Sequence, residues 1–341
     1  MSRNVLALWI GLAATAATTA CAQAGQTLDV IRDRGQLACG VSENLIGLMH
    51  TDGSGNWKGL STDVCRAVAV ALFGDVGKVE FVTLDMSKQY SALRSGLVDV
   101  LASSSTFTLQ RDTVDGADLA GVYYYDRQGL MVPLKSGKRR VEELDGTSVC
   151  VEADSVAELA VADHFWKTNM TFTPVAFDRV SELQAAFFAG KCDVFASSFR
   201  TLHVTRSAYA PNPSEYVILP TAIAKVPIGL AVRQDDHQFA DVARWALYAM
   251  IEAEEYDITS RNVAEFLKSE NSAIKRLLGV VPGMGKSLGI ADTWAYEIVR
   301  QVGNYAEVYD RSLGPRGAVN IPRALNLSWR AGGMLYAPPI R

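Results

Sequence analysis

Histidine, cysteine and long apolar runs are all scarce in this sequence, and each scarcity argues against a class of protein. The 341 residues include four histidines and five cysteines. The histidines show no metal-ligand spacing with one another or with a cysteine, so we expect no metal site. They are His50, His164, His203 and His237. The P-loop pattern G-x-x-x-x-G-K-[ST] is also absent, which excludes an ATPase of that class, and we expect no cofactor.

Positive charge is not in excess either. The chain has 33 lysine and arginine residues against 37 aspartate and glutamate residues, a net charge of −4. This mild acidity argues against nucleic acid or an anionic membrane surface as a partner. After residue 24 no run approaches the ~18–20 apolar residues that a membrane-spanning helix needs.

The first 24 residues have the three parts of an export signal. Arg3 gives a positive start, Val5–Ala17 is a short apolar core, and Ala22-Gln23-Ala24 fits a small-x-small cleavage site. We therefore expect residues 1–24 to be a signal peptide and the mature chain to begin at Gly25. A lipid anchor on Cys21 is the alternative, ranked second because the residues before it lack the leucine usual in a lipobox.

The mature chain would have 341 − 24 = 317 residues, more than the ~100–150 usual for one domain, so we expect two lobes. It retains four cysteines, and an even number in an exported chain favours disulfides over metal ligands. Of the three possible pairings we favour Cys39–Cys65 with Cys150–Cys192, because sequential pairing keeps each bridge within one lobe.

Strand and helix patterns alternate along most of the chain, which predicts an α/β fold with mostly parallel sheets. The order in residues 36–126 returns in residues 147–196, so the two lobes are expected to resemble each other in topology. The expected strands are Leu37–Val41, Lys78–Leu84, Val98–Ala102, Leu130–Val132, Thr147–Val151, Phe172–Phe177, Cys192–Ala196 and Ala224–Arg233. The expected helices are Ser61–Phe73 with a Ser61-Thr62-Asp63 cap, Lys88–Ser95, Ser155–Trp166, Val180–Ala189 and Phe239–Glu252, with two or three more beyond.

One stretch, Leu97–Arg111, combines a buried strand with a cluster of hydroxyl side chains and an arginine. Each hydroxyl can donate a hydrogen bond, and the guanidinium of Arg111 offers a planar fork that suits a carboxylate. The pattern is therefore typical of a site that holds a small carboxylate, although a polar loop with a surface arginine has the same composition. The hydroxyl residues are Ser103, Ser104, Ser105, Thr106 and Thr108.

Several fragments together resemble one family, the periplasmic solute-binding proteins of amino-acid ABC transporters (family 3), and most closely the general L-amino-acid-binding proteins. They extend over essentially the whole mature chain. The fragments are Gly55–Leu60, Asp63–Ala69, Val281–Gly289, Trp294–Tyr296, Val302–Tyr305 and the terminal Gly332–Arg341.

The resemblance implies a two-lobed type II binding-protein fold with a C-terminal helical extension. Lobe one would comprise residues 25–126 and 222–341, and lobe two residues 127–221. It further implies a monomeric periplasmic protein without enzymatic activity. The lobes would close on a small carboxylate-bearing ligand, an L-amino acid in the first place, and the loaded protein would dock on a membrane permease.

The resemblance also assigns roles within the motif. Arg111 would hold the α-carboxylate of the ligand, and Thr106 would donate to it through its hydroxyl or its backbone. Ser103 and Ser104 would line the pocket through backbone groups, whereas Thr108 either contributes or only caps the next helix.

Two positions in lobe two depart from the family pattern. Where the family has a Gly-Thr-Thr-like loop, this chain has Glu152–Ala157, which keeps a hydroxyl at Ser155 but places Asp154 next to it. We expect Asp154 to be an N-cap with its side chain turned away. Ser198 stands where the family places the aspartate that accepts the ligand's ammonium group. A neutral serine does not balance a desolvated cation.

The second departure leaves two hypotheses open. In the first, Asp154 or Glu152 supplies the missing negative charge. In the second, the ligand is an organic acid without an amine, and Arg200 could then add a second cation. For Arg200 itself, a position on the surface of a helix is favoured. Two further alternatives are a sensory binding protein and, with less support, a dehydratase-like enzyme that uses Glu152 as its acid. Against catalysis, Ser103–Ser105 have no evident base partner.

Overall fold

The computed structural model describes residues 27–42, 45–102, 106–234 and 236–341. The predicted signal peptide, the Cys21 alternative and the serines Ser103, Ser104 and Ser105 lie outside the described residues. No helix of the described part is long and apolar enough to cross a bilayer. Within the same residues no group of three or more His, Cys, Asp or Glu side chains is placed to hold a metal ion.

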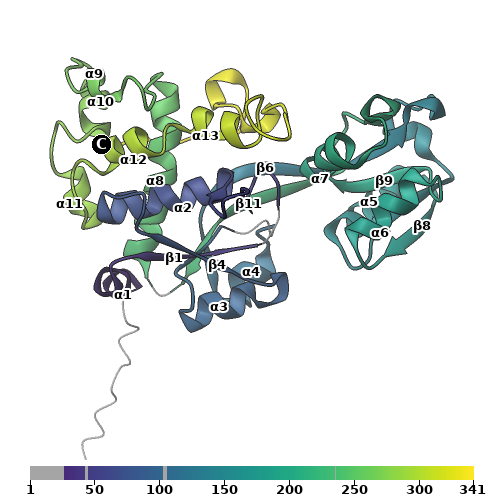
Figure 1. The fold of residues 1–341 in the computed structure, drawn as a ribbon, viewed down its shortest axis with the longest axis horizontal. Coiled ribbons are helices and arrows are strands. Elements are labelled where there is room, and N and C mark those ends of the chain that lie inside the picture. The colour runs from purple at the N-terminus through teal and green to yellow at the C-terminus, as the bar shows by residue number, and fades with distance from the viewer. Residues whose placement is uncertain (1–26, 43–44, 103–105, 235) are drawn as a thin grey trace, which may run out of the picture.

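The protein has two lobes, and each is built on three parallel strands (Figure 1). In the first lobe β1 (Leu37–Val41) lies between β4 (Val79–Thr83) and β5 (Val100–Leu101). In the second lobe β7 (Thr147–Glu152) lies between β8 (Phe172–Phe177) and β9 (Val194–Ser198). This repeated order confirms the α/β class and the similarity that the sequence predicted.

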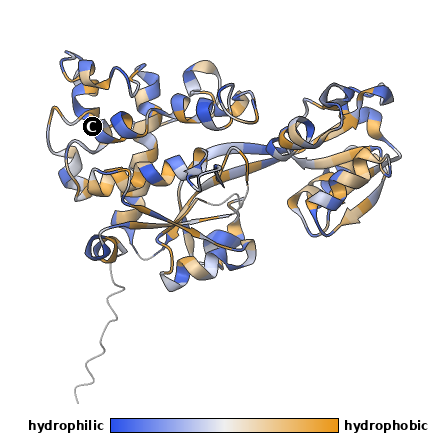
Figure 2. Cartoon of the chain, viewed as in Figure 1, coloured by the Kyte–Doolittle hydropathy of each residue, from blue (hydrophilic) through white to orange (hydrophobic). Residues whose placement is uncertain are grey.

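Two long antiparallel strands join the lobes. They are β6 (Ala117–Pro133) and β11 (Ala224–Arg233), which pair with each other from Ala117–Arg233 to Gln128–Ala224. Because β11 also pairs with β5 and β6 also pairs with β9, a single hydrogen-bonded path, β4-β1-β5-β11-β6-β9-β7-β8, crosses the molecule. The connecting stretch contains Asp126, Arg127 and Gln128 and is partly coloured hydrophilic, and both lobes are of mixed colour (Figure 2).

Helices cover the sheet faces of both lobes. The first lobe carries α1 (Thr27–Arg34), α2 (Leu60–Phe73), α3 (Gln89–Ser95), α4 (Leu109–Thr113) and α8 (His237–Glu255). The second carries α5 (Val156–Lys167), α6 (Val180–Phe188) and α7 (Phe199–Val204). Beyond α8 come α9 (Val263–Phe266), α10 (Ser272–Leu277), α11 (Met284–Leu288), α12 (Trp294–Gln301) and α13 (Tyr305–Ser312). Short strands β2 (His50–Thr51), β3 (Trp57–Lys58) and β10 (Tyr216–Ile218) complete the fold.

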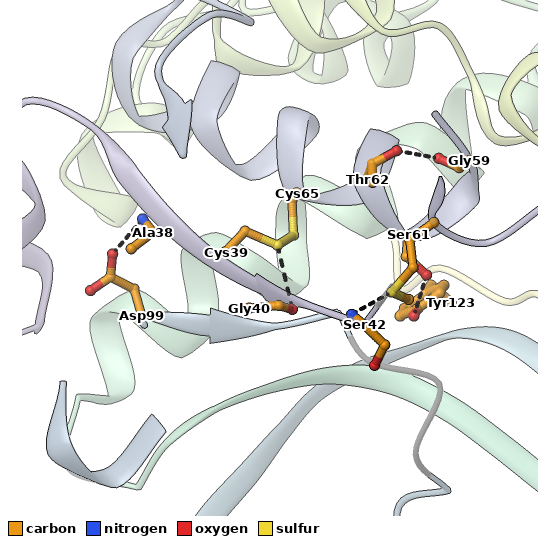
Figure 3. Close-up of a disulfide and its surroundings, with 11 residues drawn as sticks. Ala38, Cys39, Gly40, Ser42, Gly59, Ser61, Thr62, Cys65, Asp99 and Tyr123 are labelled. Carbon is orange, nitrogen blue, oxygen red and sulfur yellow. Dashed lines mark hydrogen bonds between the residues drawn. A yellow bond between two sulfur atoms is a disulfide. The ribbon is translucent and has the colours of Figure 1, made fainter. Parts of the chain in front are cut away.

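Each lobe has its own core and its own disulfide. Buried apolar residues of α2, α8, α12 and α13 pack on the first sheet, and separate clusters form around β7 and β9 in the second lobe. Cys39 on β1 is bonded to Cys65 on α2 (Figure 3), and Cys150 on β7 is bonded to Cys192 before β9. The predicted pairing is therefore confirmed, and each bridge ties a strand to a neighbouring element of the same lobe.

Most predicted elements are present within a residue or two, and the exceptions have physical reasons. Helix α2 begins after Gly59, whose backbone carbonyl accepts a hydrogen bond of 2.8 Å from the Thr62 hydroxyl, so the predicted Ser61-Thr62-Asp63 cap is wrong. Strand β5 has two residues rather than five, whereas β6 runs unbroken for 17 residues past Tyr123–Asp126. Five short helices, α9 to α13, follow α8 where two or three were expected.

Candidate functional site

A cleft of about 510 Å³ lies between the lobes and is lined by both of them. The first lobe provides Thr106, Thr108 and Arg111. The joining strands provide Asp126 and Gln128 from β6 with Val226 and Ile228 from β11. The second lobe provides Glu152, Asp154, Ser155, Ser198 and Arg200. Every described residue that the sequence analysis placed in the site thus borders this one cleft.

Arg111 is held in place by two neighbours in the first lobe. Its Nη1 donates to Asp115 Oδ2 at 2.6 Å, one turn further along, and its guanidinium carbon lies 4.2 Å from the ring centroid of Tyr90. The side chain remains 35% exposed, so part of the fork faces the cleft. A guanidinium that is oriented by stacking and one carboxylate retains donors for a second carboxylate.

The two threonines of the motif are used differently. Thr108 is the N-cap of α4, because its Oγ1 accepts a hydrogen bond of 3.4 Å from the backbone N–H of Arg111. Thr106 forms an isolated antiparallel bridge with Ile228 of β11, and the next residue, Phe107, donates its backbone N–H to Pro227 at 3.1 Å. The motif is therefore anchored to a joining strand, and the capping interpretation of Thr108 is the one that the geometry supports.

The second-lobe loop differs from the N-cap expectation for Asp154. Ser155 is the N-cap of α5, with its Oγ accepting from the backbone N–H of Glu158 at 3.2 Å. Asp154 adopts a left-handed backbone conformation with φ of 55°, and its N–H donates to Glu158 Oε2 at 2.8 Å. The Asp154 side chain is exposed, whereas Glu152 is half-buried and burial raises its pKa. The predicted cap at Asp154 is therefore wrong by one residue.

Ser198 ends β9 and caps α7, and it contacts a carboxylate that the sequence analysis missed. Its Oγ accepts from the backbone N–H of Thr201 at 3.2 Å and donates to Thr201 Oγ1 at 3.1 Å, and it lies close enough to Asp126 to lower the pKa of that carboxyl. Asp126 is 4% exposed and accepts a further hydrogen bond of 2.8 Å from the backbone N–H of Arg127. Burial raises the pKa of Asp126, while these hydrogen bonds and the charge of Arg200 oppose that rise.

Gln128 is the second cleft residue that sequence reasoning missed. It lies two positions after Asp126 on β6 and pairs in register with Ser198 of β9. Its side chain is 6% exposed, and its Oε1 is buried without a hydrogen-bond partner. The signal in the sequence was the run Asp126-Arg127-Gln128, three consecutive polar residues inside a largely apolar strand, which is unusual unless a site requires them.

Arg200 is not the surface helix residue that the sequence favoured. It is 9% exposed, lies in α7, and donates from Nη2 to Thr201 Oγ1 at 3.2 Å. Arg200 also lines a second cavity of about 670 Å³, which shares Glu152 and Met86 with the cleft. Arg200 is the second residue of α7, which follows β9 directly and forms part of the cleft wall.

One enzyme-like sequence pattern occurs away from the cleft. Residues Gly285–Gly289 read G-x-S-x-G, but Ser287 lies inside α11 with its Oγ donating to the carbonyl of Met284 at 2.7 Å. A nucleophile elbow requires a strand-to-helix turn with the serine at its apex, so this pattern is not one.

Comparison with known proteins gives consistent results along the chain. Residues 37–263 match the model of the bacterial extracellular solute-binding proteins, family 3. The chain is 40% identical, over 100% of both sequences, to the general L-amino acid-binding periplasmic protein AapJ of Rhizobium johnstonii. It is 41% identical, over 98% of both, to the glutamate/glutamine/aspartate/asparagine-binding protein BztA of Rhodobacter capsulatus.

A solved structure shows the same arrangement of elements. The periplasmic binding protein from Brucella ovis with glutathione bound is 42% identical, with a TM-score of 0.85 over 93% of this chain and 99% of that one. Both full-length relatives also span α9–α13, most of which lies beyond the stretch matched by the family model.

Proposed function

The chain belongs to family 3 of the bacterial extracellular solute-binding proteins, and on that basis we propose that it captures an L-amino acid in the periplasm and delivers it to the permease of an ABC importer. The observation that carries the proposal is Arg111, which is oriented by Tyr90 and Asp115 and faces a cleft lined by both lobes. The full-length relatives are named as binding proteins, which supports transport rather than catalysis.

In this proposal the α-carboxylate of the ligand takes the free donors of Arg111. Thr106 adds its hydroxyl from the same wall of the cleft, and Ser155 faces it from the second lobe. Ser103 and Ser104 keep their proposed role of lining the pocket through backbone groups. The Ser155 oxygen already accepts the N-cap hydrogen bond from the Glu158 N–H, and its hydroxyl proton can still donate to the carboxylate.

We propose that the two lobes close around the ligand. We assign residues 25–126 and 222–341 to lobe one and residues 127–221 to lobe two, with β6 and β11 as the connection between them. A ligand that contacts both lobes stabilises only the closed arrangement, which shifts the population toward the form that a permease recognises. The proposed mature protein is a periplasmic monomer whose signal peptide ends at Ala24.

Calorimetry on refolded, ligand-free protein tests the proposal. Titration with the twenty common L-amino acids should give binding of at least one, and Arg111→Lys should weaken it about 10- to 100-fold because a lysine lacks the planar fork. Arg94→Lys is the matched control, since Arg94 also lies beside Asp115, at 3.8 Å, but does not border the cleft. Absence of binding to every amino acid, with binding of an organic acid, would contradict the proposal.

Glutathione belongs in the same panel. Its glutamyl end carries a free α-carboxylate and α-amino group, so it presents to Arg111 the same two groups as an amino acid. The Brucella ovis structure with glutathione bound is the specific reason to include it. Tight binding of glutathione together with weak binding of single amino acids would extend the ligand class to small peptides of this kind.

A further inference from the structure

We infer that the ammonium group of the ligand binds on the connecting strand β6, in a subsite formed by Asp126, Gln128 and Ser198. The inference rests on the proposed function, because it presumes a ligand with an α-amino group. It replaces the two earlier hypotheses, in which Asp154 or Glu152 supplied the missing negative charge or the ligand had no amine.

The three side chains converge because of strand geometry. Residues two apart on a β-strand project from the same face, so Asp126 and Gln128 point the same way, and both border the cleft. Ser198 pairs in register with Gln128 across β6 and β9, and its side chain lies close to the Asp126 carboxylate. Two neighbouring strands thus present three oxygen-bearing side chains to one spot.

An unused acceptor identifies the spot as a binding site. The side chain of Gln128 is 6% exposed, and its Oε1 has no hydrogen-bond partner. Buried acceptors without a partner are rare in native proteins, because the lost hydrogen bond with water is not replaced. A donor from the ligand would satisfy it.

The chemistry of the three groups matches an ammonium ion. An ammonium has three donors and one positive charge, and the subsite offers a carboxylate, an amide oxygen and a hydroxyl oxygen. Asp126 is buried, and an incoming cation stabilises its ionised form. The carboxylate stands beside Ser198, so the negative charge that this chain lacks at position 198 is provided by the adjacent strand.

The competing carboxylates fit less well. Asp154 is exposed, and its backbone N–H donates to Glu158 in the turn before α5. Glu152 lies on β7, which pairs with β9 on the side opposite to β6, so β9 separates it from the strand that carries Asp126 and Gln128. A subsite on the connecting strand also has a consequence for closure. Asp126 and Gln128 belong to the segment about which the lobes would move, so they would contact the amine before and after closure.

The test compares ligands with and without the amine. For ligand-free wild-type protein, calorimetry gives the ratio of affinities for L-alanine over propionate and for L-glutamate over glutarate. Asp126→Asn should reduce that ratio about 10- to 100-fold, and Gln128→Met should reduce it about 5-fold or more, because each removes an acceptor to a charged donor. Asp118→Asn, on the same strand but outside the cleft, is the matched control and should leave the ratio unchanged.

A rescue variant separates recognition from folding. In the Asp126→Asn background, Ser198→Asp returns a carboxylate to the neighbouring strand and should restore preference for the amine. Unchanged ratios in Asp126→Asn and Gln128→Met, or a loss confined to Glu152→Gln, would overturn the inference while leaving the proposed function intact. Failure of the wild-type protein to bind any amino acid or glutathione would overturn both.

Discussion

Arg111 shares its guanidinium with Asp115: Nη1 donates to Oδ2 at 2.6 Å, and the Asp115 side chain is only 17% exposed. The arginine proposed to hold the ligand is therefore partly neutralised before any ligand arrives. The contact orients the fork, but the carboxylate of Asp115 also repels an incoming carboxylate.

The first prediction concerns this pair. Asp115→Asn retains an oxygen that accepts from Nη1 and removes the negative charge, so affinity for L-amino acids should rise about 3- to 10-fold. Calorimetry against the tightest-binding amino acid measures it, with Asp112→Asn on α4 as control. A loss of affinity would mean that the charge of Asp115, rather than its hydrogen bond, positions Arg111.

The second prediction concerns Asn326 in the C-terminal extension, which binds the connecting strand. Asn326 is 3% exposed; its Oδ1 accepts from Tyr125 N–H at 2.7 Å, and its Nδ2 donates to the Tyr125 carbonyl at 3.1 Å. Asn326→Ala leaves two backbone groups unpaired and should lower the free energy of unfolding by about 1–3 kcal/mol. Asn326→Asp keeps the acceptor for the Tyr125 N–H but sets a buried carboxylate oxygen against the Tyr125 carbonyl, so it should lose at least as much stability as Asn326→Ala. Equal stability of all three proteins in urea titrations would show that the contact is not formed in solution.

The third prediction concerns pH. Burial, with the neighbouring Glu255 carboxylate, raises the pKa of Glu252 from 4.5 to about 7, and its Oε2 has no hydrogen-bond partner. The folded protein therefore binds this proton more tightly than the unfolded chain does, so the contribution of Glu252 to stability falls as the pH rises from about 4.5 to 7.

Glu252→Gln removes that dependence. The variant should be more stable than the wild type at pH 8 by about 1–3 kcal/mol, and the difference should shrink toward pH 4. Urea unfolding at several pH values measures it. Glu270→Gln, on a side chain that is 94% exposed, serves as control and should follow the wild type throughout. A variant that is less stable than the wild type at pH 8 would contradict the sign.

The fourth prediction concerns the second-lobe disulfide, Cys150–Cys192, which closes a separation of 42 residues. Replacing both cysteines by serine should lower the free energy of unfolding by about 2–4 kcal/mol, because the unfolded chain regains the freedom that the bridge removed. The same unfolding measurement on reduced wild-type protein provides a comparison. A change below about 0.5 kcal/mol would indicate that the lobe is held by its packing alone.

Sequence reasoning predicted the lobes and most elements because apolar alternation and glycine punctuation are local signals. Gly96 illustrates this, since it ends α3 in a left-handed conformation that favours glycine. The place of Arg111 in the cleft and the cysteine pairs were also predicted, because the hydroxyl-rich run that ends in Arg111 and the order of the four cysteines can be seen in the sequence itself. The length of β6 could not be predicted from the sequence, because the polar run Asp126–Gln128 has the composition of a loop. Its pairing with β11 and β9 is what makes it part of a strand.

Part of the site could not be predicted either, because it depends on contacts between elements that are distant in the sequence. Asp126 and Gln128 lack any motif, and their role depends on the register that places Ser198 beside them. Arg200 reads as a surface residue until the turn after β9 buries it. The cap at Ser155 rather than Asp154 depends on which residue takes the positive φ, which composition does not determine.

A crystal structure of the protein with its tightest-binding amino acid tests the account most directly. The account predicts closed lobes, the ligand's α-carboxylate on the guanidinium of Arg111, and its ammonium facing Asp126, Gln128 and Ser198. A ligand whose carboxylate lies away from Arg111, with its amine on Glu152 or Asp154, would contradict it.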